Sequence, residues 1–434
     1  MEEIPVIQIY LWGNLVGAIS WDDESGYAYF QFDNNFRRLG LDVSPLMMPL
    51  SRTLGVMSFP ANARTKCFSG LPGLIADSLP DKFGSQLITE WFAQQGKTEE
   101  MITPLDRLCY VGKRAMGALE FVPAKDVEGV NESTKIYIRE LMAISDAIFK
   151  ERSKFQELIR QKDKSILDIL KVGTSAGGAK PKAIIAYNEE TGEVRSGQVP
   201  APDGFSYWLL KFDGGIYSEH QEITDNPHGI GNIEYAYYKM ATSCGIIMSE
   251  SKLLAEGEYH HFMTRRFDRT PTGEKIHMQT AAGIAHLDRD VRHSYEELFG
   301  VLRRLGLNYK DFEQLYRRMV FNVMARNHDD HTKNFSFLMD KRGHWSFAPA
   351  YDLCYSYNPV GRWTNRHQLS VNSKTDDFTR KDLLAVAQNI GIRDANHIVE
   401  EICSSVASWP KIAKECGVKT NHIKAIGKTL LLKI

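Results

Sequence analysis

The densest group of reactive side chains in the chain is the octet at 327–334, which holds two aspartates, two histidines and a lysine. Kinase-type phosphoryl transfer uses an aspartate that orients or deprotonates the attacking hydroxyl and an asparagine, five positions later, that holds Mg²⁺. Asp329 and Asn334 have this spacing. A further acid must hold the metal that bridges the phosphates, and Asp352 follows Asn334 by 18 positions. These residues predict a phosphotransferase site.

Two other interpretations of the octet remain open. Its polar side chains could form only a solvated loop that caps a helix. Pairs of histidine and aspartate also bind divalent metals in phosphohydrolases, but such a site needs further histidine ligands. The available ones, His286 and His293, lie in a polar stretch that we expect to be exposed. The hydrolase interpretation is therefore less favoured.

A glycine-rich stretch at 172–182 leads into an apolar segment that we expect to be a strand. Backbone N–H groups freed by Gly173, Gly177 and Gly178 can cradle a phosphate, and Lys182 stands at the entrance of the strand. The spacing differs from that of a Walker motif, and the loop opens a strand rather than a helix. The loop is thus either a simple turn or the phosphate-binding loop of a kinase-like small lobe.

Lys211 ends an apolar strand, where a lone ammonium group is costly unless an acid pairs with it. A kinase-type strand lysine has such a partner on a neighbouring helix. Glu234, at the start of an aromatic-rich helical run, is the best candidate, and Glu222 is the second. The alternative is a lysine on an edge strand whose ammonium group reaches water.

The elements that must position these residues follow from periodicity and turn residues. The first part of the chain is β-rich, prolines exclude long helices from 41–85, and a polar segment at 126–132 offers a boundary. Apolar residues with 3-4 spacing predict a helix at 312–324 that runs directly into the octet. The expected strands are 6–11, 15–21, 27–32, 117–122, 183–187, 207–212, 335–339 and 345–347, and the last two form a hairpin. The other expected helices are 82–95, 134–171 and one that begins after Thr379 and ends at Gly391.

Composition limits the class of protein. The 434 residues suggest two or three packed units, and 43% hydrophobic with 25% charged residues is typical of a globular chain. A net charge of −1 excludes a strongly basic nucleic-acid coat. Six cysteines without a C-x-x-C pair indicate reduced thiols. The first residues lack the basic and apolar regions typical of a signal peptide, and no apolar run has the length of a membrane span, so we expect a soluble cytoplasmic protein.

Four segments together resemble the HipA-type serine/threonine kinases, which are the toxins of bacterial type II toxin–antitoxin pairs. The segments are 70–80, 175–182, 266–269, and 327–336 together with 348–353. The resemblance implies an α+β, bilobal protein-kinase-like fold with an extra β-rich N-terminal subdomain and a mainly α-helical C-terminal lobe. The corresponding units are a subdomain at 1–130, a small lobe with the glycine-rich loop at 131–266, and a helical lobe with the catalytic and metal motifs at 267–434.

The same resemblance implies roles for individual residues. Asp329 would be the catalytic aspartate, with His331 and Lys333 beside it, and Asn334 and Asp352 would bind Mg²⁺. The residues expected to bind ATP lie in the glycine-rich loop, at the lysine–glutamate pair and in the hinge: Ser175, Ala176, Gly177, Gly178, Ala179, Lys180, Lys182, Lys211, Glu234, Thr264, Arg265, Arg266 and Phe267.

The family also implies regulation and partners. Its members phosphorylate a serine of their own glycine-rich loop, here Ser175 with Thr174 as the alternative, and the added charge beside ATP would inactivate the enzyme. Their substrate is an aminoacyl-tRNA synthetase or another translation factor. A separately encoded helix-turn-helix antitoxin links them to DNA. Two alternatives remain: a small-molecule phosphotransferase on the same fold, and a nucleotide-binding corepressor.

Overall fold

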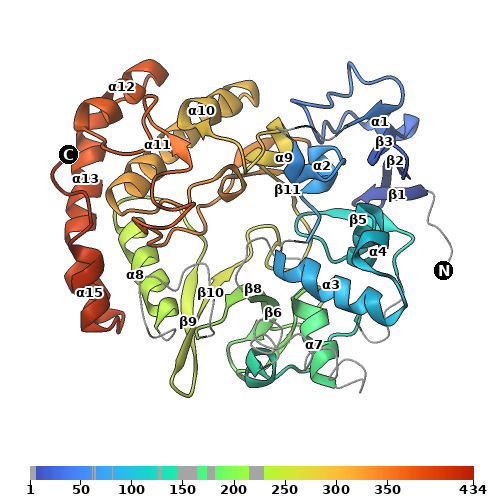
Figure 1. The fold of residues 1–434 in the computed structure, drawn as a ribbon, viewed down its shortest axis with the longest axis horizontal. Helices are drawn as coiled ribbons and strands as arrows, with labels where there is room; N and C mark the ends of the chain where they lie inside the picture. Colours follow the sequence, from blue (N-terminus) through green and yellow to red (C-terminus); the bar gives the residue numbers. More distant parts are fainter. Residues whose placement is uncertain are drawn as a thin grey trace.

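The computed structural model describes residues 6–60, 62, 65–80, 82–125, 130–143, 164–173, 181–214 and 229–434. Its elements form an N-terminal antiparallel sheet, a second antiparallel sheet and a largely helical C-terminal lobe (Figure 1). The expected α+β architecture, with a β-rich beginning and a helical end, is confirmed.

The N-terminal sheet has the strand order β4-β3-β2-β1-β5. Its strands are β1 (Val6–Leu11), β2 (Asn14–Asp22), β3 (Tyr27–Phe32), β4 (Met57–Ser58) and β5 (Leu119–Val122). All but the two-residue β4, which was not predicted, lie close to the predicted ranges. Alternate residues face the core, as expected for a sheet with one solvated face.

Short helices follow this meander. The helix within the proline-rich stretch has only four residues, as the prolines predict. The helices of this part are α1 (Asn34–Leu39), α2 (Gly73–Ala76), α3 (Lys82–Gln94) and α4 (Pro104–Val111).

The second sheet has the strand order β7-β6-β8-β10-β9. Its strands are β6 (Lys182–Asn188), β7 (Val194–Ser196), β8 (Phe205–Lys211), β9 (Ser251–Glu256) and β10 (Tyr259–Arg265). The turn after β6 therefore leads to the short strand β7, while β8 pairs with the other side of β6. As a result β8 is the central strand, which overturns the edge-strand alternative for the lysine that ends it.

The helix predicted over 134–171 is only partly present. Residues 138–143 are helical, as is α7 (Lys164–Val172), and 144–163 lie outside the described residues. Lys135 instead forms a β-bridge with Arg195 of β7, so the start of the segment is extended. An extended chain can satisfy the open edge of β7, which explains the departure from helical periodicity.

Helix α8 (Ile230–Ser243) packs between the second sheet and the C-terminal helices (Figure 1). One apolar cluster runs from the N-terminal sheet into the second sheet and so continues across residue 130. Another cluster contains the apolar face of α8 together with the C-terminal lobe. The helix therefore links the two lobes.

The C-terminal lobe begins with a small sheet in the order β11-β13-β14. The predicted helix before the octet and the predicted hairpin after it are both confirmed as α11, β13 and β14. The elements are β11 (His277–Thr280), α9 (Ala281–Ala285), β12 (His293–Ser294), α10 (Tyr295–Arg304), α11 (Tyr309–Met324), a 3-10 turn (Thr332–Asn334), β13 (Ser336–Met339), β14 (Trp345–Phe347), β15 (Leu369–Ser370), α12 (Arg380–Ile390), α13 (Ala395–Ala407), α14 (Trp409–Glu415) and α15 (Thr420–Gly427).

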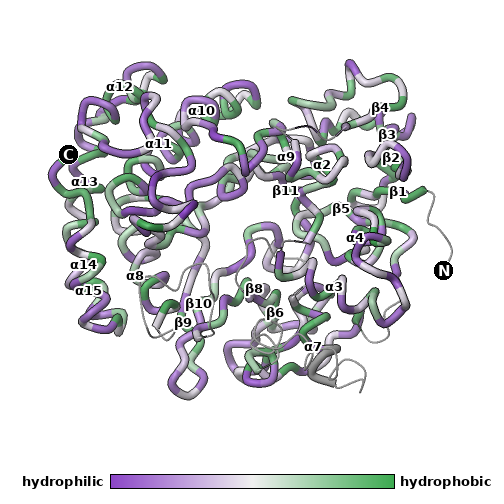
Figure 2. Tube along the Cα trace, in the orientation of Figure 1, coloured by the Kyte–Doolittle hydropathy of each residue, from purple (hydrophilic) through white to green (hydrophobic). Residues whose placement is uncertain are grey.

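Among the described residues, no helix combines the length and the apolar character needed to cross a membrane. Hydrophilic residues recur along the outer helices, such as α13 and α15 (Figure 2).

Gly231 allows α8 to approach β10. A Cβ atom at this position would lie 1.9 Å from the carbonyl oxygen of His260, so α8 would have to move. We expect Gly231→Ala to lower the free energy of unfolding by about 1–3 kcal/mol, measured by thermal or urea unfolding.

The matched control is Gly300 in α10, where a Cβ would meet no atom within 4 Å. Gly300→Ala should be neutral or stabilise the protein by up to about 1 kcal/mol, because alanine favours a helix. Equal effects of the two substitutions would contradict the close approach at Gly231.

Candidate active site

The ammonium group of Lys211 joins the two lobes. It donates hydrogen bonds to the carboxylates of both Glu234 in α8 and Asp352 after β14. The side chain of Lys211 is 15% exposed and that of Glu234 is 7% exposed. Burial alone would lower the pKa of Lys211, but Asp352 and Glu234 raise it above its ordinary value. The expected pairing of Lys211 with Glu234 is thus present, and Asp352 completes it.

Asp213 sets the position of α8 relative to Lys211. One of its carboxylate oxygens accepts hydrogen bonds from the backbone N–H groups of Gly229 and Ile230, at 2.8 and 2.9 Å. The other accepts the N–H of His260 in β10 at 3.2 Å. Because Asp213 follows Lys211 by two residues, one end of β8 supplies both the lysine and the acid that caps the helix. Asp213 was not predicted from the sequence, although its place just after the strand lysine was a usable signal.

Asp352 follows β14 and has a φ of 54°, in the left-handed region that non-glycine residues rarely adopt. Its carbonyl oxygen accepts a hydrogen bond of 3.3 Å from the side-chain amide of Asn327. Burial alone would raise the pKa of its carboxyl group, but Lys211 and then Lys182 hold it well below its usual range. Asp352 is therefore a carboxylate at neutral pH.

Asp329 presents its carboxylate to solvent, with 45% of the side chain exposed. Its backbone is held in place: the N–H donates to the Ser356 hydroxyl at 2.9 Å, and the carbonyl oxygen accepts the Asn334 amide at 2.6 Å. The imidazole Nε2 of His331 lies 3.7 Å from a carboxylate oxygen of Asp329. The predicted residues Asp329, His331 and Asn334 are thus brought together around an accessible carboxylate.

Asp330, the next residue, points the opposite way and is completely buried. Its carboxylate accepts hydrogen bonds from the Tyr295 hydroxyl and the Gln368 N–H, each at 2.8 Å, and lies 2.8 Å from His367 Nδ1. Burial lowers the pKa of the neighbouring His328 to about 2, so that ring is neutral. The interpretation of the octet as only a solvated cap is therefore wrong, because half of it is core.

The side-chain oxygens of Asn334 and Asp352 have the chemistry that suits a divalent cation. The amide nitrogen of Asn334 donates to the backbone of Asp329, which leaves the amide oxygen of Asn334 as an acceptor next to the loop. This oxygen and the carboxylate of Asp352 are the hard ligands that Mg²⁺ prefers. Asn334 and Asp352 would hold the ion.

The hydrolase alternative finds no such support. Within the described ranges, no group of three or more His, Cys, Asp and Glu side chains could hold a metal ion. His286 accepts the N–H of Gly73 through Nε2 at 2.9 Å, and His293 lies 3.3 Å from a carboxylate oxygen of Glu297. Both histidines are half-buried and engaged, so the expectation that they are exposed is wrong.

The predicted hinge lies where β10 ends. Thr264 accepts a hydrogen bond from Ser251 at 3.0 Å, and Arg265 lies 3.3 Å from Glu250. The guanidinium group of Arg266 is 1% exposed and binds Asp268 at 2.8 and 2.6 Å. The side chain of Arg266 is therefore committed to a salt bridge, and its backbone N–H donates to the carbonyl oxygen of Tyr207 at 2.9 Å.

Phe267 contacts the ring of Tyr351, with 5.5 Å between ring centroids, and so reaches the residue before Asp352. Lys182 is buried and is the register partner of Lys211. The other loop residues expected to bind ATP lie outside the described residues; they are Ser175, Ala176, Gly177, Gly178, Ala179 and Lys180. The alternatives Thr174 and Glu222 also lie outside them.

Lys333 faces the N-terminal subdomain. Asp77, at the end of α2, accepts hydrogen bonds from the N–H and hydroxyl of Thr280 at 2.7 and 2.8 Å. Burial raises the pKa of Asp77 to about 6, and the positive charge of Lys333 opposes this shift. The hydroxyl of Thr332 also donates to the carbonyl of Leu287 at 2.8 Å. The subdomain thus packs against α9, and α9 in turn contacts the 3-10 turn of the octet.

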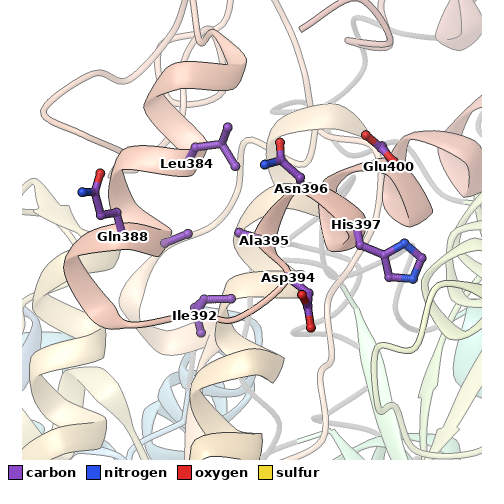
Figure 3. A pocket seen from close by; sticks show the side chains of 9 residues that line it. Leu384, Gln388, Ile392, Asp394, Ala395, Asn396, His397 and Glu400 are labelled. Carbon is purple, nitrogen blue, oxygen red and sulfur yellow. The ribbon is translucent and has the colours of Figure 1, made fainter.

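A surface pocket of about 590 Å³ lies elsewhere, between α12 and α13 (Figure 3). Leu384, Gln388, His397 and Glu400 are among its lining residues. None of the predicted site residues contributes to it, so it plays no part in the site described above.

Comparisons with known proteins show the family and the fold of this chain. A family model described as HipA N-terminal domain matches residues 7–122, and one described as HipA-like C-terminal domain matches residues 174–410. A Haemophilus influenzae protein named "Putative kinase" is 22% identical over 230 residues, covering 45% of this chain and 67% of the relative. The "Putative kinase Y4dM" of Sinorhizobium fredii is 27% identical over 171 residues, covering 36% of this chain and 39% of that protein.

Among solved structures, the HipA of Shewanella oneidensis MR-1, determined with HipB and operator DNA, has a TM-score of 0.65 and 17% identity to this chain. The match covers 97% of this chain and 94% of that one. Fold and site together define a bilobal, protein-kinase-like protein with a β-rich N-terminal subdomain. The extent of the family matches then places it more narrowly: this chain belongs to the HipA family of kinases.

The adjacent aspartates should respond differently to the same substitution. Asp330→Asn leaves buried donors without a charged acceptor and should lower the free energy of unfolding by about 3 kcal/mol. Asp329→Asn, at an exposed carboxylate, should change it by less than about 0.5 kcal/mol. Urea unfolding of both variants at neutral pH measures the difference. A larger loss at Asp329 than at Asp330 would reverse the assignment.

Proposed function

We propose that this protein is an ATP- and Mg²⁺-dependent serine/threonine protein kinase. The observation that carries the proposal is the convergence of Lys211, Glu234 and Asp352 beside a loop that presents Asp329 and Asn334. A structural loop does not need an exposed carboxylate held by its backbone next to a lysine that pairs with two acids. Kinase-type phosphoryl transfer needs both features.

Each residue has a definite task in this reaction. Lys211 and Lys182 attract the phosphates of ATP, and Glu234 keeps Lys211 in place. Asp329 orients the acceptor hydroxyl and takes its proton, as the bond from the acceptor oxygen to the γ-phosphorus forms and the bond to the leaving ADP oxygen breaks. Asn334 and Asp352 would hold Mg²⁺, which would neutralise negative charge on the phosphate oxygens when bound.

The family suggests the biological setting. We propose that the protein acts in the cytoplasm as the toxin of a toxin–antitoxin pair, phosphorylates an aminoacyl-tRNA synthetase or another translation factor, and binds a separately encoded helix-turn-helix antitoxin through which it reaches DNA. The solved Shewanella complex of HipA with HipB and DNA supports the partner. We further propose autophosphorylation of Ser175, where negative charge would repel the phosphates of ATP.

Phosphate transfer tests the proposal. Phosphatase-treated protein is incubated with Mg²⁺ and γ-labelled ATP, alone and with a bacterial lysate, and labelled sites are mapped by mass spectrometry. We expect label on the glycine-rich loop and on a lysate protein. Asp329→Ala should lower both by about 100-fold or more, because it removes the base.

Glu415→Ala is the control, since Glu415 is an exposed acid on α14, outside the site, and its loss should leave transfer unchanged. Label only on a metabolite would instead indicate a small-molecule phosphotransferase. Binding of ATP without any transfer would indicate a nucleotide-binding corepressor. Undiminished transfer by Asp329→Ala would reject the assignment of the base.

A further inference from the structure

The loop at 357–366 is attached at both ends to the two aspartates of the octet at 327–334, which we call the catalytic loop. Ser356, just before it, accepts the N–H of Asp329 at 2.9 Å and donates to the Asn327 side chain at 3.0 Å. His367 and Gln368, just after it, contact the carboxylate of Asp330, each at 2.8 Å. The loop therefore leaves and returns beside the expected acceptor site.

Hydrogen bonds within the loop hold its shape. The N–H of Asn358 donates to the carbonyl of Thr364 at 3.2 Å, and the Asn358 side chain accepts the N–H of Val360 at 3.1 Å. Asn358 and Thr364 are both buried, while four of the five residues between them are exposed and Gly361 is half-buried. Hydrogen bonds between buried residues thus close the loop, and they hold its exposed side chains in a fixed arrangement.

Two large apolar side chains lie exposed on this turn. Val360 is 82% exposed and Trp363 is 52% exposed. Val360 is four residues from Ser356, which places it within about 14 Å of that anchor even if the chain were fully extended. Exposed apolar side chains that cluster next to a site are typical of surfaces that bind another protein, and tryptophan contributes strongly at such surfaces.

The charge of the same loop has one sign. Arg362 and Arg366 are exposed, and the stretch 353–375 contains no Asp or Glu. The guanidinium group of Arg362 lies 5.0 Å from the ring centroid of Trp363. Within the described part of the chain, neither arginine forms a salt bridge with an acid, whereas Arg326 nearby pairs with Asp376 at 3.3 Å. Arg362 and Arg366 are therefore free to pair with acidic residues of another protein, and Val360 and Trp363 can contact an apolar residue of the same segment.

We propose that the 357–366 loop docks the acceptor protein by binding a segment rich in Asp and Glu next to the phosphorylated serine or threonine. Arg362 and Arg366 select the acidic residues, and Val360 with Trp363 holds an apolar side chain of the same segment. This rests on the proposed kinase function, whose substrate it narrows to hydroxyls in an acidic context.

Three short labelled peptides test the docking. They share a central serine and one leucine and differ only in flanking residues, which are Glu, Gln or Lys. Binding is measured by fluorescence anisotropy without ATP. We expect the wild type to bind the Glu peptide at least tenfold more tightly than the Lys peptide. The double variant Arg362→Glu/Arg366→Glu should reverse this preference. Trp363→Ala should weaken binding of all three peptides but keep the preference for the Glu peptide.

The matched control is Arg393→Glu. Arg393 is also exposed and lies over a tyrosine ring, that of Tyr309, at 5.5 Å. Tyr309 begins α11, and the catalytic loop follows the other end of this 16-residue helix, about 24 Å away. This variant should keep the wild-type preference. Equal binding of the three peptides by the wild type, or an unchanged preference in the double variant, would overturn the proposal.

Transfer to the same peptides with Mg²⁺ and ATP separates the two proposals. Charge-selective binding without any transfer would leave the docking surface standing and count against the kinase function. Transfer with no difference between the Glu and Lys peptides would leave the kinase function standing and overturn the docking surface. Transfer that follows the binding preference supports both.

Discussion

The ammonium group of Lys211 can remain in its largely buried position only while both of its carboxylate partners are present. Leaving one ion of such a group unpaired typically costs about 3–5 kcal/mol, so the pairing constrains the whole molecule. Its three members come from strand β8, helix α8 and the segment after β14, which lie far apart in the chain. Asp213 caps α8, and Gly231 lets α8 approach β10; both features place Glu234 next to Lys211. The relative placement of the two lobes is therefore tied to the geometry of the site.

The catalytic loop divides structural and chemical tasks between neighbouring residues. Asp330 turns inward to a buried tyrosine and histidine, and this fixes the backbone that leaves Asp329 exposed. The N-terminal subdomain supports the same region from behind, because Asp77 holds the start of α9 and Asp268 binds the N–H of Gly117 at 2.8 Å. The subdomain is thus part of the support of the active site.

Local sequence patterns predicted the elements well. The helix before the octet and the hairpin after it follow from short-range periodicity, and both are present. The pairing of Lys211 with Glu234 follows from one buried charge that needs a partner, and it is also present. The central position of β8, the inward turn of Asp330 and the burial of Arg266 were not predictable. They depend on contacts between residues far apart in the chain, and two adjacent aspartates look alike until their surroundings are known.

The central claim is that the corner formed by Lys211, Asp352 and Asn334 binds the phosphates of Mg²⁺-bound ATP. Calorimetric titration of ATP with Mg²⁺ into the wild type, Lys211→Met and Asp329→Asn tests it most directly. We expect ATP binding to be at least tenfold weaker in Lys211→Met and nearly unchanged in Asp329→Asn, because only Lys211→Met loses a side chain that binds the phosphates. Equal affinity of wild type and a folded Lys211→Met protein would contradict it.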